Sequence, residues 1–301
     1  MPCVSVGFPV FNGEKYLEPA LDSIITQTFT DFELIISDNA STDRTQAICM
    51  EYAARDPRIR YYRNDRNLGA APNFNKVVKL SSGKYFKWAA YDDLIAPDFL
   101  MRCVEVMDQH PEVVLCFPRV KIIDQNGAYQ ENYIPEPETV GVEVQKRFRN
   151  LLLYPHLSTQ FYGLIRSSVL KKTSLLGNFP SSDEVFLIEL GFQGDFYEVP
   201  DYLFLLRKHS EQSTEGSYQV QRARTVWFDT SWKGKIVLPK WIYFFTSMRA
   251  IRSSRLNTIK RVYCYRQMLK WVIVPSHFRA MGKDGLIAAN QFIRSIGRPV
   301  V

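Results

Sequence analysis

The chain has 301 residues, of which 46% are hydrophobic and 14% aromatic, so it can bury a large core. This composition excludes a disordered chain and allows either one large α/β domain with an appendage or two domains. The net charge of +7 favours an anionic partner, namely a phosphorylated ligand, an acidic lipid or nucleic acid, although a basic surface without specific meaning fits the same number.

The predicted strands and helices alternate over residues 4–117. The sequence predicts strands over 4–9, 32–37, 59–62, 85–89 and 113–117. Periodic apolar residues predict helices over 14–26, 72–80 and 97–110, and a further helix that Thr42 would cap. This spacing is typical of βαβ units, whose parallel sheet is covered on both faces.

The pattern is less regular after residue 117. Residues 121–127 predict a strand entering a tight hairpin, and the Pro- and Glu-rich residues 129–144 predict a mobile loop over the site. Further predictions are helices over 143–154, near Ser168 and after 179–184, and strands over 160–165, 196–199 and 202–206. Beyond about Ser217, patterns rich in Arg, Lys and aromatic residues predict a helical appendage.

The cysteines and the apolar runs indicate the compartment. Five scattered cysteines without a CxxC pair are typical of reduced thiols in a cytoplasmic protein. The N-terminus lacks the pattern of a secretory signal, and no apolar run approaches the roughly 18–20 residues that span a bilayer. We therefore expect a cytoplasmic protein, with contact at the inner face of the cell membrane left open.

Polar side chains follow each of the first four predicted strands. They are Asn12, Asp38, Arg66 with Asn67, and Asp92 with Asp93. Ligands of open α/β sheets bind beyond the carboxyl ends of the strands, so these side chains predict one site. The alternative for the acid pair is a solvent-exposed turn that caps the next helix. An acid-lined site in a basic protein suggests a divalent cation and displacement at a nucleotide diphosphate.

Several other enzyme classes are disfavoured by missing motifs. The sequence has no GxxxxGK[ST], GxGxxG, HExxH or GxSxG pattern, which argues against P-loop ATPases, dinucleotide enzymes, zinc proteases and α/β-hydrolases. A nucleotidyltransferase normally carries a Gly-rich, Arg-containing phosphate loop after its first strand, and FPVFNGEKY lacks it.

Four stretches occur in order along the chain: VSVGFPVFNGEKYLEPALDSIITQTFTDFELIISDNASTDRT, Asn67-Leu68-Gly69, WAAYDD and DEVFLIELGFQGDFYEVPDYLFLLRKHSEQST. Through these stretches the chain resembles a family 2 glycosyltransferase of the GT-A fold over about Pro2 to Thr214. The resemblance implies a Rossmann-like αβα sandwich with a mostly parallel central sheet. We expect a catalytic domain over 1–215, with a nucleotide half over 1–117 and an acceptor half over 118–215, and a helical extension over 216–301.

The resemblance also implies roles at the nucleotide. Pro9, Phe11 and Asn12 match the loop beside the nucleotide, and Asp38 matches the acid that hydrogen-bonds the base. Arg66 and Asn67 match a further nucleotide loop. The alternatives are an Asx-turn acid at Asp38 and solvated turn residues at 66 and 67.

The remaining roles concern the metal and the reaction. Asp92 matches the acid that binds the metal and diphosphate, and Asp93 is expected to orient the donor sugar, although Ala90 replaces the first acid of the family's DxD motif. His209 is a candidate ligand for the metal or diphosphate, with a structural hydrogen bond as the alternative; Arg207 is a candidate cation for phosphate. Asp183 matches the catalytic base, and the alternative is a helix N-cap, with Glu184 as the substitute base.

The implied activity is inverting transfer of a sugar from a UDP- or dTDP-sugar to a saccharide or lipid-linked saccharide acceptor. We expect Mn²⁺ or Mg²⁺ as cofactor, a role in bacterial surface polysaccharide synthesis, and no nucleic-acid partner. The alternative function is a non-catalytic nucleotide-sugar-binding or assembly subunit. The C-terminal helices leave two accounts open, a peripheral membrane surface, or a homodimer interface or lid.

Overall fold

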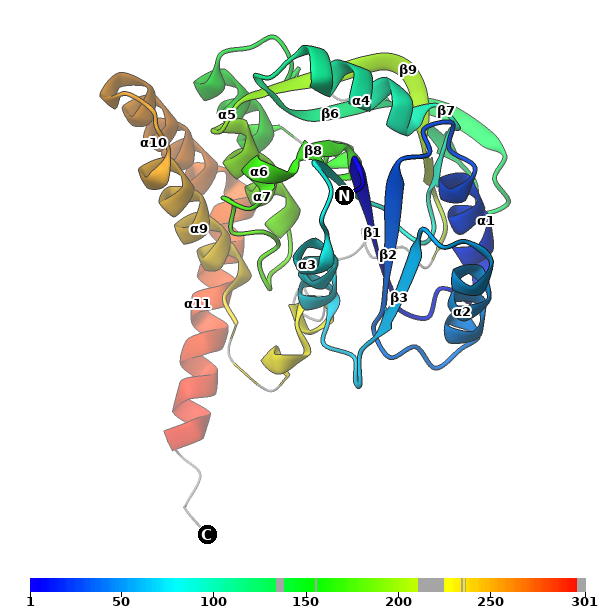
Figure 1. Cartoon of the computed structure of the whole chain (residues 1–301). Coiled ribbons are helices and arrows are strands. Elements are labelled where there is room, and N and C mark those ends of the chain that lie inside the picture. The colour runs from blue at the N-terminus through cyan, green and yellow to red at the C-terminus, as the bar shows by residue number, and fades with distance from the viewer. Residues whose placement is uncertain (134–137, 155, 211–224, 234, 236, 297–301) are drawn as a thin grey trace.

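The computed structural model describes residues 1–133, 138–154, 156–210, 225–233, 235 and 237–296. The described strands form one nine-stranded sheet in the order β3-β2-β1-β4-β8-β6-β9-β5, with β7 paired to β6 (Figure 1). Helices cover both faces of this sheet, and three further helices follow at the C-terminal end. The expected α/β fold with a C-terminal helical extension is confirmed.

The N-terminal half alternates strands and helices, as the sequence predicts. Its elements are β1 (Val4–Val10), α1 (Glu14–Ile25), β2 (Phe32–Asp38), α2 (Thr45–Arg55), β3 (Ile59–Arg63), α3 (Ala70–Leu80), β4 (Tyr85–Trp88), β5 (Leu94–Ile95) and α4 (Phe99–Gln109). Strands β1 to β4 pair in parallel, so their carboxyl ends meet at one edge of the sheet.

The second half adds antiparallel strands. Its elements are β6 (Val113–Ile123), β7 (Tyr129–Tyr133), α5 (Val144–Leu153), η1 (Thr159–Tyr162), β8 (Leu164–Arg166), α6 (Ser167–Leu170), α7 (Ser182–Gly191), β9 (Asp195–Arg207), η2 (Thr230–Trp232), α9 (Pro239–Ser253), α10 (Thr258–Ile273) and α11 (Pro275–Ile296). Strand β8 lies antiparallel between β4 and β6, whereas β6 and β9 run parallel.

The two-residue period of the strands divides the core between the two faces. Val6 and Phe8 of β1 pack in the cluster that includes side chains of α1, α2 and α4, and Figure 1 shows α1 and α2 on one side of β1 to β3. Gly7 faces the other side, where a Cβ would lie 2.6 Å from atoms of Val77 and Phe86. Glycine at this position lets α3 pack closely on the sheet.

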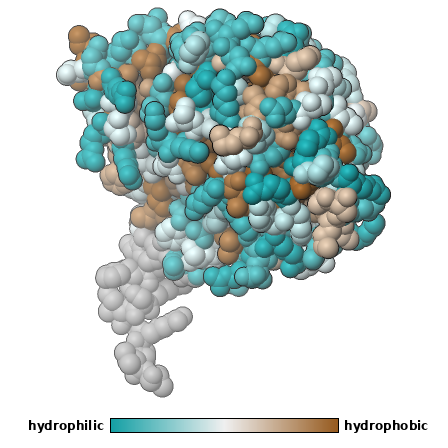
Figure 2. Space-filling model, viewed as in Figure 1, coloured by the Kyte–Doolittle hydropathy of each residue, from teal (hydrophilic) through white to brown (hydrophobic). Residues whose placement is uncertain are grey.

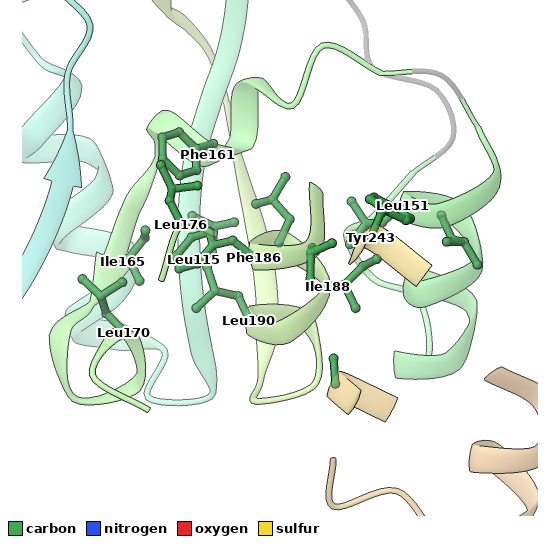
Figure 3. Close-up of a cluster of buried hydrophobic side chains, with 14 of the residues drawn as sticks. Leu115, Leu151, Phe161, Ile165, Leu170, Leu176, Phe186, Ile188, Leu190 and Tyr243 are labelled. Atoms are coloured by element: carbon green, nitrogen blue, oxygen red, sulfur yellow. The ribbon is translucent and has the colours of Figure 1, made fainter. Parts of the chain in front are cut away.

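The second cluster lies under the acceptor half of the chain. Figure 3 shows its side chains converging from β6, α5, α7 and the segment of η1 and β8, with Tyr243 of α9 in the same cluster. Trp88 stacks on Phe161 at a ring distance of 4.5 Å and donates a hydrogen bond to the Phe74 carbonyl. Trp88 therefore packs in the core, where it is 0% exposed.

The C-terminal helices pack on the rest of the chain through buried apolar faces. Helix α9 contacts α7, and α10 contacts both α5 and α9. Ile251, Cys264, Met268 and Trp271 are at most 2% exposed. Within the described part of the chain, no helix is both long enough and apolar enough to cross a bilayer.

Four local predictions are wrong. Residues 160–165 are not one strand, because Gly163 separates η1 from the three-residue β8. Residues 129–133 form strand β7 at the sheet edge, where mostly exposed side chains give no apolar period; residues 134–137 of the predicted loop lie outside the described part. Thr42 does not cap α2, since Arg44 precedes that helix without a side-chain capping bond.

The fourth wrong prediction concerns residues 196–199 and 202–206. They were predicted as two strands but belong to the single strand β9. Its register against β6 shifts between the Val199–Pro118 and Tyr202–Arg119 pairs. Proline has no N–H for the ladder, so an irregularity at Pro200 lets one strand continue through it.

Candidate functional site

The turns after β1 and β2 hold each other in place. The Asn12 carboxamide oxygen accepts a hydrogen bond from the Thr42 amide at 2.9 Å, and Asn12 has a φ of 49°, which asparagine tolerates better than most residues. Asp43 accepts from the Glu14 amide at 3.1 Å, and the Glu14 carboxylate accepts from the Arg44 amide at 2.8 Å. Each turn thus satisfies orphan amides at the start of the other turn's helix.

Two further predicted residues lie at the end of β1. Pro9 is buried within the strand, where it is in register with Ser37 of β2. Phe11 follows the strand and is 38% exposed. Pro9 therefore shapes the strand end, and Phe11 is the side chain of this pair that remains accessible to a ligand.

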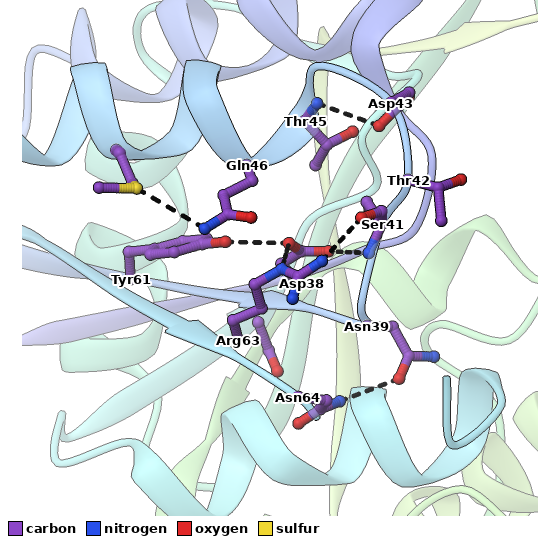
Figure 4. A network of polar contacts seen from close by, with 12 residues as sticks. Asp38, Asn39, Ser41, Thr42, Asp43, Thr45, Gln46, Tyr61, Arg63 and Asn64 are labelled. Atoms are coloured by element: carbon purple, nitrogen blue, oxygen red, sulfur yellow. Dashed lines mark hydrogen bonds and ion pairs between the residues drawn. The ribbon is translucent and has the colours of Figure 1, made fainter. Parts of the chain in front are cut away.

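Asp38 is the centre of a closed polar network (Figure 4). Its carboxylate accepts hydrogen bonds from the Ser41 amide at 2.8 Å, the Tyr61 hydroxyl at 2.9 Å and Arg63 Nε at 3.1 Å. Its side chain is 0% exposed, whereas Arg63 is 36% exposed. A base could reach this carboxylate only after the Arg63 guanidinium moves, so the base-binding role of Asp38 stays a prediction.

The loop after β3 is tied to the same edge of the sheet. The Asn67 carboxamide oxygen accepts hydrogen bonds from Asn39 at 2.9 Å and from the Gly69 amide at 2.8 Å. Gly69 has a φ of 93°, and a Cβ there would lie 2.6 Å from the Phe228 carbonyl oxygen. Asn67 thus orders the loop, whereas Arg66 is exposed and has no recorded partner among the described residues.

The acid pair after β4 reaches across the sheet to β9. The Asp92 carboxylate lies 3.1 Å from Nε2 of His209, whose side chain is 1% exposed. Asp93 is 7% exposed and accepts a hydrogen bond from the Arg207 amide at 2.9 Å. Helix α4 begins only after Asp98, so the alternative of two solvent-exposed capping acids is wrong.

Arg207 is a clamp around the acid pair. Its side chain donates hydrogen bonds to the carbonyl oxygens of Asp92 at 2.8 Å, and of Asp124 and Gln125 at 3.2 Å each. Arg207 is 4% exposed, and its guanidinium lies 4.9 Å from the Tyr16 ring centroid. Its donors hold backbone carbonyls inside the protein, and its role toward phosphate stays a prediction.

A buried amine lies below the acids. Lys87 is 0% exposed, and its ammonium donates hydrogen bonds to the carbonyls of Tyr162 at 2.7 Å and Trp88 at 3.0 Å. Burial lowers the pKa of Lys87 to about 7, against the opposing influence of the Asp93 charge. Burial and the neighbouring Asp92 charge raise the pKa of the Asp93 carboxyl well above its ordinary value.

Tyr162 links this pair to Asp183. Burial raises the pKa of the Tyr162 phenol, and the charges of Asp93, Asp92 and Asp183 raise it further. The phenol is therefore close enough to feel carboxylates from both β4 and α7. Asp183 and the acid pair are thus within electrostatic range of one buried side chain, although about 90 residues separate them in the sequence.

Asp183 lies in the first turn of α7. Ser181, with a φ of 64°, is at the N-cap position and no side chain caps the helix, so the N-cap alternative for Asp183 is wrong. Burial and the charge of Asp183 raise the pKa of the neighbouring Glu184. The cations that oppose this shift are His156 and Lys240, and Lys240 belongs to α9 of the C-terminal extension.

The comparisons with known proteins agree with this geometry. The family model described as "Glycosyl transferase family 2" matches residues 5–173, more than half of the chain. The chain belongs to glycosyl transferase family 2. The match covers the four strand ends and the acid pair, whereas Asp183 and His209 lie beyond its end.

The relatives support the family over a similar length. An uncharacterized glycosyltransferase of Methanocaldococcus jannaschii is 34% identical over 57% of this chain and 58% of its own length. One of Rickettsia typhi is 29% identical over 58% of this chain and 53% of its own. The chain thus spans about half the length of these relatives.

Solved structures show the GT-A fold of the family. Residues 1–349 of S. aureus TarS in complex with UDP-GlcNAc match 89% of this chain and 72% of theirs, at a TM-score of 0.66 and 18% identity. A mannosyltransferase of Pyrobaculum calidifontis in complex with GDP-Man and Mn²⁺ matches 96% and 86%, at a TM-score of 0.52 and 14% identity. These likenesses concern the fold.

Asp92 and His209 are the two side chains of this family 2 site that could ligate a divalent cation. In the described ranges no group of three or more His, Cys, Asp or Glu could hold an ion. The 3.1 Å separation of the Asp92 oxygen and His209 Nε2 suits two neighbouring ligands, which are about 3.0 Å apart around an octahedral ion with bonds of about 2.1 Å. Substrate phosphates and water commonly complete such a site.

Sequence reasoning missed several residues of the family 2 site. Tyr61, Arg63, Tyr162 and Lys240 were not predicted, nor were the contacts of Arg207 with backbone carbonyls. Tyr61 and Arg63 alternate on the last residues of β3, next to Asp38 on β2, so the strand register carried a usable signal. No sequence signal pointed to Lys240, because only the packing of α9 on α7 brings it near Glu184.

Proposed function

We propose that this protein is an inverting glycosyltransferase that moves a sugar from a UDP- or dTDP-sugar to an acceptor hydroxyl. The observation that carries the proposal is the 3.1 Å contact of Asp92 with His209 beyond the carboxyl ends of the parallel strands, with Asp183 within electrostatic range of Tyr162, as Asp92 is. The Asp92 carboxylate beside His209 suits binding of a cation and a diphosphate, and the Asp183 carboxylate suits the role of a base. Membership in glycosyl transferase family 2 supports the same reaction class.

The donor diphosphate lies at Asp92 and His209 in this proposal. Mn²⁺ or Mg²⁺ would be held there and would neutralise negative charge on the departing nucleotide diphosphate. Support comes from two neighbours in fold, one solved with UDP-GlcNAc and the other with GDP-Man and Mn²⁺. Phe11, Asn12, Asp38 and the Arg66–Asn67 loop would contact the nucleoside, and Asp93 would support the donor sugar by positioning the end of β4.

Asp183 acts as the general base. Its carboxylate accepts the acceptor hydroxyl proton while that oxygen bonds to the anomeric carbon and the bond from this carbon to the diphosphate oxygen breaks. Attack opposite the leaving group inverts the configuration.

The acceptor in this proposal is a saccharide or a lipid-linked saccharide of a bacterial surface polysaccharide, used at the cytoplasmic face of the membrane. We assign catalysis to residues 1–215 and a supporting role to 216–301. Phe228 beside Gly69 supports a contribution of the extension to the nucleotide loop, and Lys240 beside Glu184 supports one to the acceptor side.

The experiment is nucleotide diphosphate release from a panel of UDP- and dTDP-sugars with Mn²⁺ and membrane saccharide acceptors. Asp183→Asn should lower turnover by about 10²–10⁴-fold while leaving donor binding intact, because it removes the base alone. Glu189→Gln, on the same helix and bonded to Ser174, is the matched control and should keep wild-type turnover. Normal turnover by Asp183→Asn would refute the base, and donor binding without release by the wild type would favour the non-catalytic subunit.

A further inference from the structure

Helix α10 presents an apolar stripe to solvent on the side opposite its packed face. We call it the outer stripe, and it consists of Ile259, Val262, Arg266, Leu269, Lys270 and Ile273. The aliphatic members are strongly exposed: Ile259 by 82%, Leu269 by 63% and Ile273 by 71%. Ile259, Val262, Arg266, Leu269 and Ile273 follow one another at intervals of three or four residues, which places them on one face of the helix.

The exposed apolar surface continues past the end of α10. Val274 is 37% exposed, and Phe278 in the first turns of α11 is 66% exposed. Figure 2 shows apolar side chains among hydrophilic ones over the C-terminal helices at the upper left. Packing of α10 on α5 and α9 uses Cys264, Met268 and Trp271 instead, so it leaves the outer stripe uncovered by described residues.

The charge of the chain is concentrated in the same region. Residues 239–301 contain 12 Lys and Arg and a single acid, Asp284, which gives a net charge of +11. The whole chain has a net charge of +7, so residues 1–238 have a net charge of −4. Asp284 is 2% exposed and accepts a hydrogen bond from the Lys240 amide, which leaves the helical surface without an exposed acid among residues 239–287.

We propose that the outer stripe binds the surface of an anionic lipid bilayer. The aliphatic side chains of the outer stripe enter the boundary between headgroups and acyl chains, and Arg266 and Lys270 on the same face contact lipid phosphates. Arg252 and Arg255, exposed at the turn between α9 and α10, add positive charge beside it. The surface is independent of the transfer reaction.

The charges argue against the other occupants. A second copy related by a two-fold axis would bring Arg266 and Lys270 of both copies together, and residues 239–287 contribute no exposed acid to pair them. Nucleic acid would satisfy the cations but leave Ile259, Leu269 and Ile273 in water, since aliphatic side chains offer no ring for base stacking. An anionic bilayer matches both the cations and the aliphatic side chains.

The test is flotation of the full chain with vesicles of phosphatidylcholine alone or with about one third phosphatidylglycerol. We expect binding to the anionic vesicles only, weakened by salt. Arg266→Gln with Lys270→Gln should lower partitioning about 25-fold, at about fivefold for each cation removed. Ile259→Ser with Leu269→Ser should lower it at least about 10-fold through lost apolar burial.

Matched controls lie away from the stripe. Lys79→Gln with Lys171→Gln removes two exposed cations elsewhere, and Met50→Ser removes an apolar side chain that is 54% exposed on α2; both should bind as the wild type does. Equal losses in the controls and the stripe variants would overturn the proposal. So would absence of vesicle binding, a dimer that only stripe substitutions dissociate, or binding to duplex DNA that outcompetes the vesicles.

Discussion

Replacing Arg207 by lysine tests whether the acid pair is held from β9. The guanidinium donates to three backbone carbonyls, those of Asp92, Asp124 and Gln125, from one rigid plane. A lysine ammonium keeps the positive charge but cannot reach three carbonyls spread over two loops. Arg207→Lys therefore removes the geometry of the clamp without removing its charge.

The magnitude follows from the lost hydrogen bonds. A buried hydrogen bond to a charged group contributes roughly 1.5–3 kcal/mol, and lysine would retain one of the three bonds. Relaxation of the two loops offsets part of the loss, so we expect the free energy of unfolding to fall by about 3 kcal/mol. The freed Asp92 backbone should also weaken donor binding, because its carboxylate would no longer be fixed beside His209.

Urea denaturation measures the first effect, and titration with a UDP-sugar and Mn²⁺ measures the second. Arg119→Lys is the matched control, since Arg119 forms an exposed ion pair with Glu198 and should tolerate the change. Arg207→Lys would refute the reasoning if its stability and donor affinity both equalled those of the wild type. A loss of stability with unchanged donor affinity would refute the positioning of Asp92 alone.

Three further predictions concern single side chains. The folded pKa of Lys87 is about 7 against an ordinary 10.5, so the unfolded chain binds more protons between these values and stability rises with pH there. Lys87→Met should remove up to about 1.4 kcal/mol per pH unit from the slope of unfolding free energy between pH 7 and 10, and identical slopes would contradict the lowered pKa. The raised pKa of Glu184 gives stability that is complete below its unfolded pKa and lost as pH rises through the folded value. The melting temperature of Glu184→Gln, relative to that of the wild type, should therefore be higher at pH 8 than at pH 4. The same difference in melting temperature at both pH values would contradict this. His209→Ala should weaken Mn²⁺-dependent donor binding at least roughly 10-fold in calorimetry but leave metal-free binding unchanged, whereas equal losses in both would assign His209 a structural role.

The sequence predicts the parallel half of the fold well because its signals are local. Strands β1, β2 and β4 are mostly apolar and polar residues follow each within four positions, and the carboxyl ends of parallel strands must share an edge. The position of Asp183 in the first turn of α7 is likewise predicted. Strand β7 lacks such a signal, because its side chains are mostly exposed at an edge where cross-strand pairing alone orders them.

Contacts between distant segments could not be predicted from residue type. Asp38 is suited equally to a base and to the closed network with Tyr61 and Arg63, and only the register of β2 and β3 distinguishes these partners. Arg207 and Asp92 are 115 residues apart, and their contact depends on the pairing of β5 with β9. His209, two residues beyond the end of β9, lies beside Asp92, and in our proposal it would provide the second ligand that the missing acid at Ala90 does not.

Donor binding with and without a divalent cation tests the central claim, that the edge of the sheet at Asp92 and His209 holds a nucleotide diphosphate. The measurement is a thermal-shift screen of UDP- and dTDP-sugars against the full chain, with Mn²⁺, Mg²⁺ or chelator. We predict that at least one donor raises the melting temperature only with the cation, and that Asp92→Asn abolishes this shift. Absence of stabilisation by every donor in every condition, or a cation-dependent shift that Asp92→Asn leaves intact, would contradict the account.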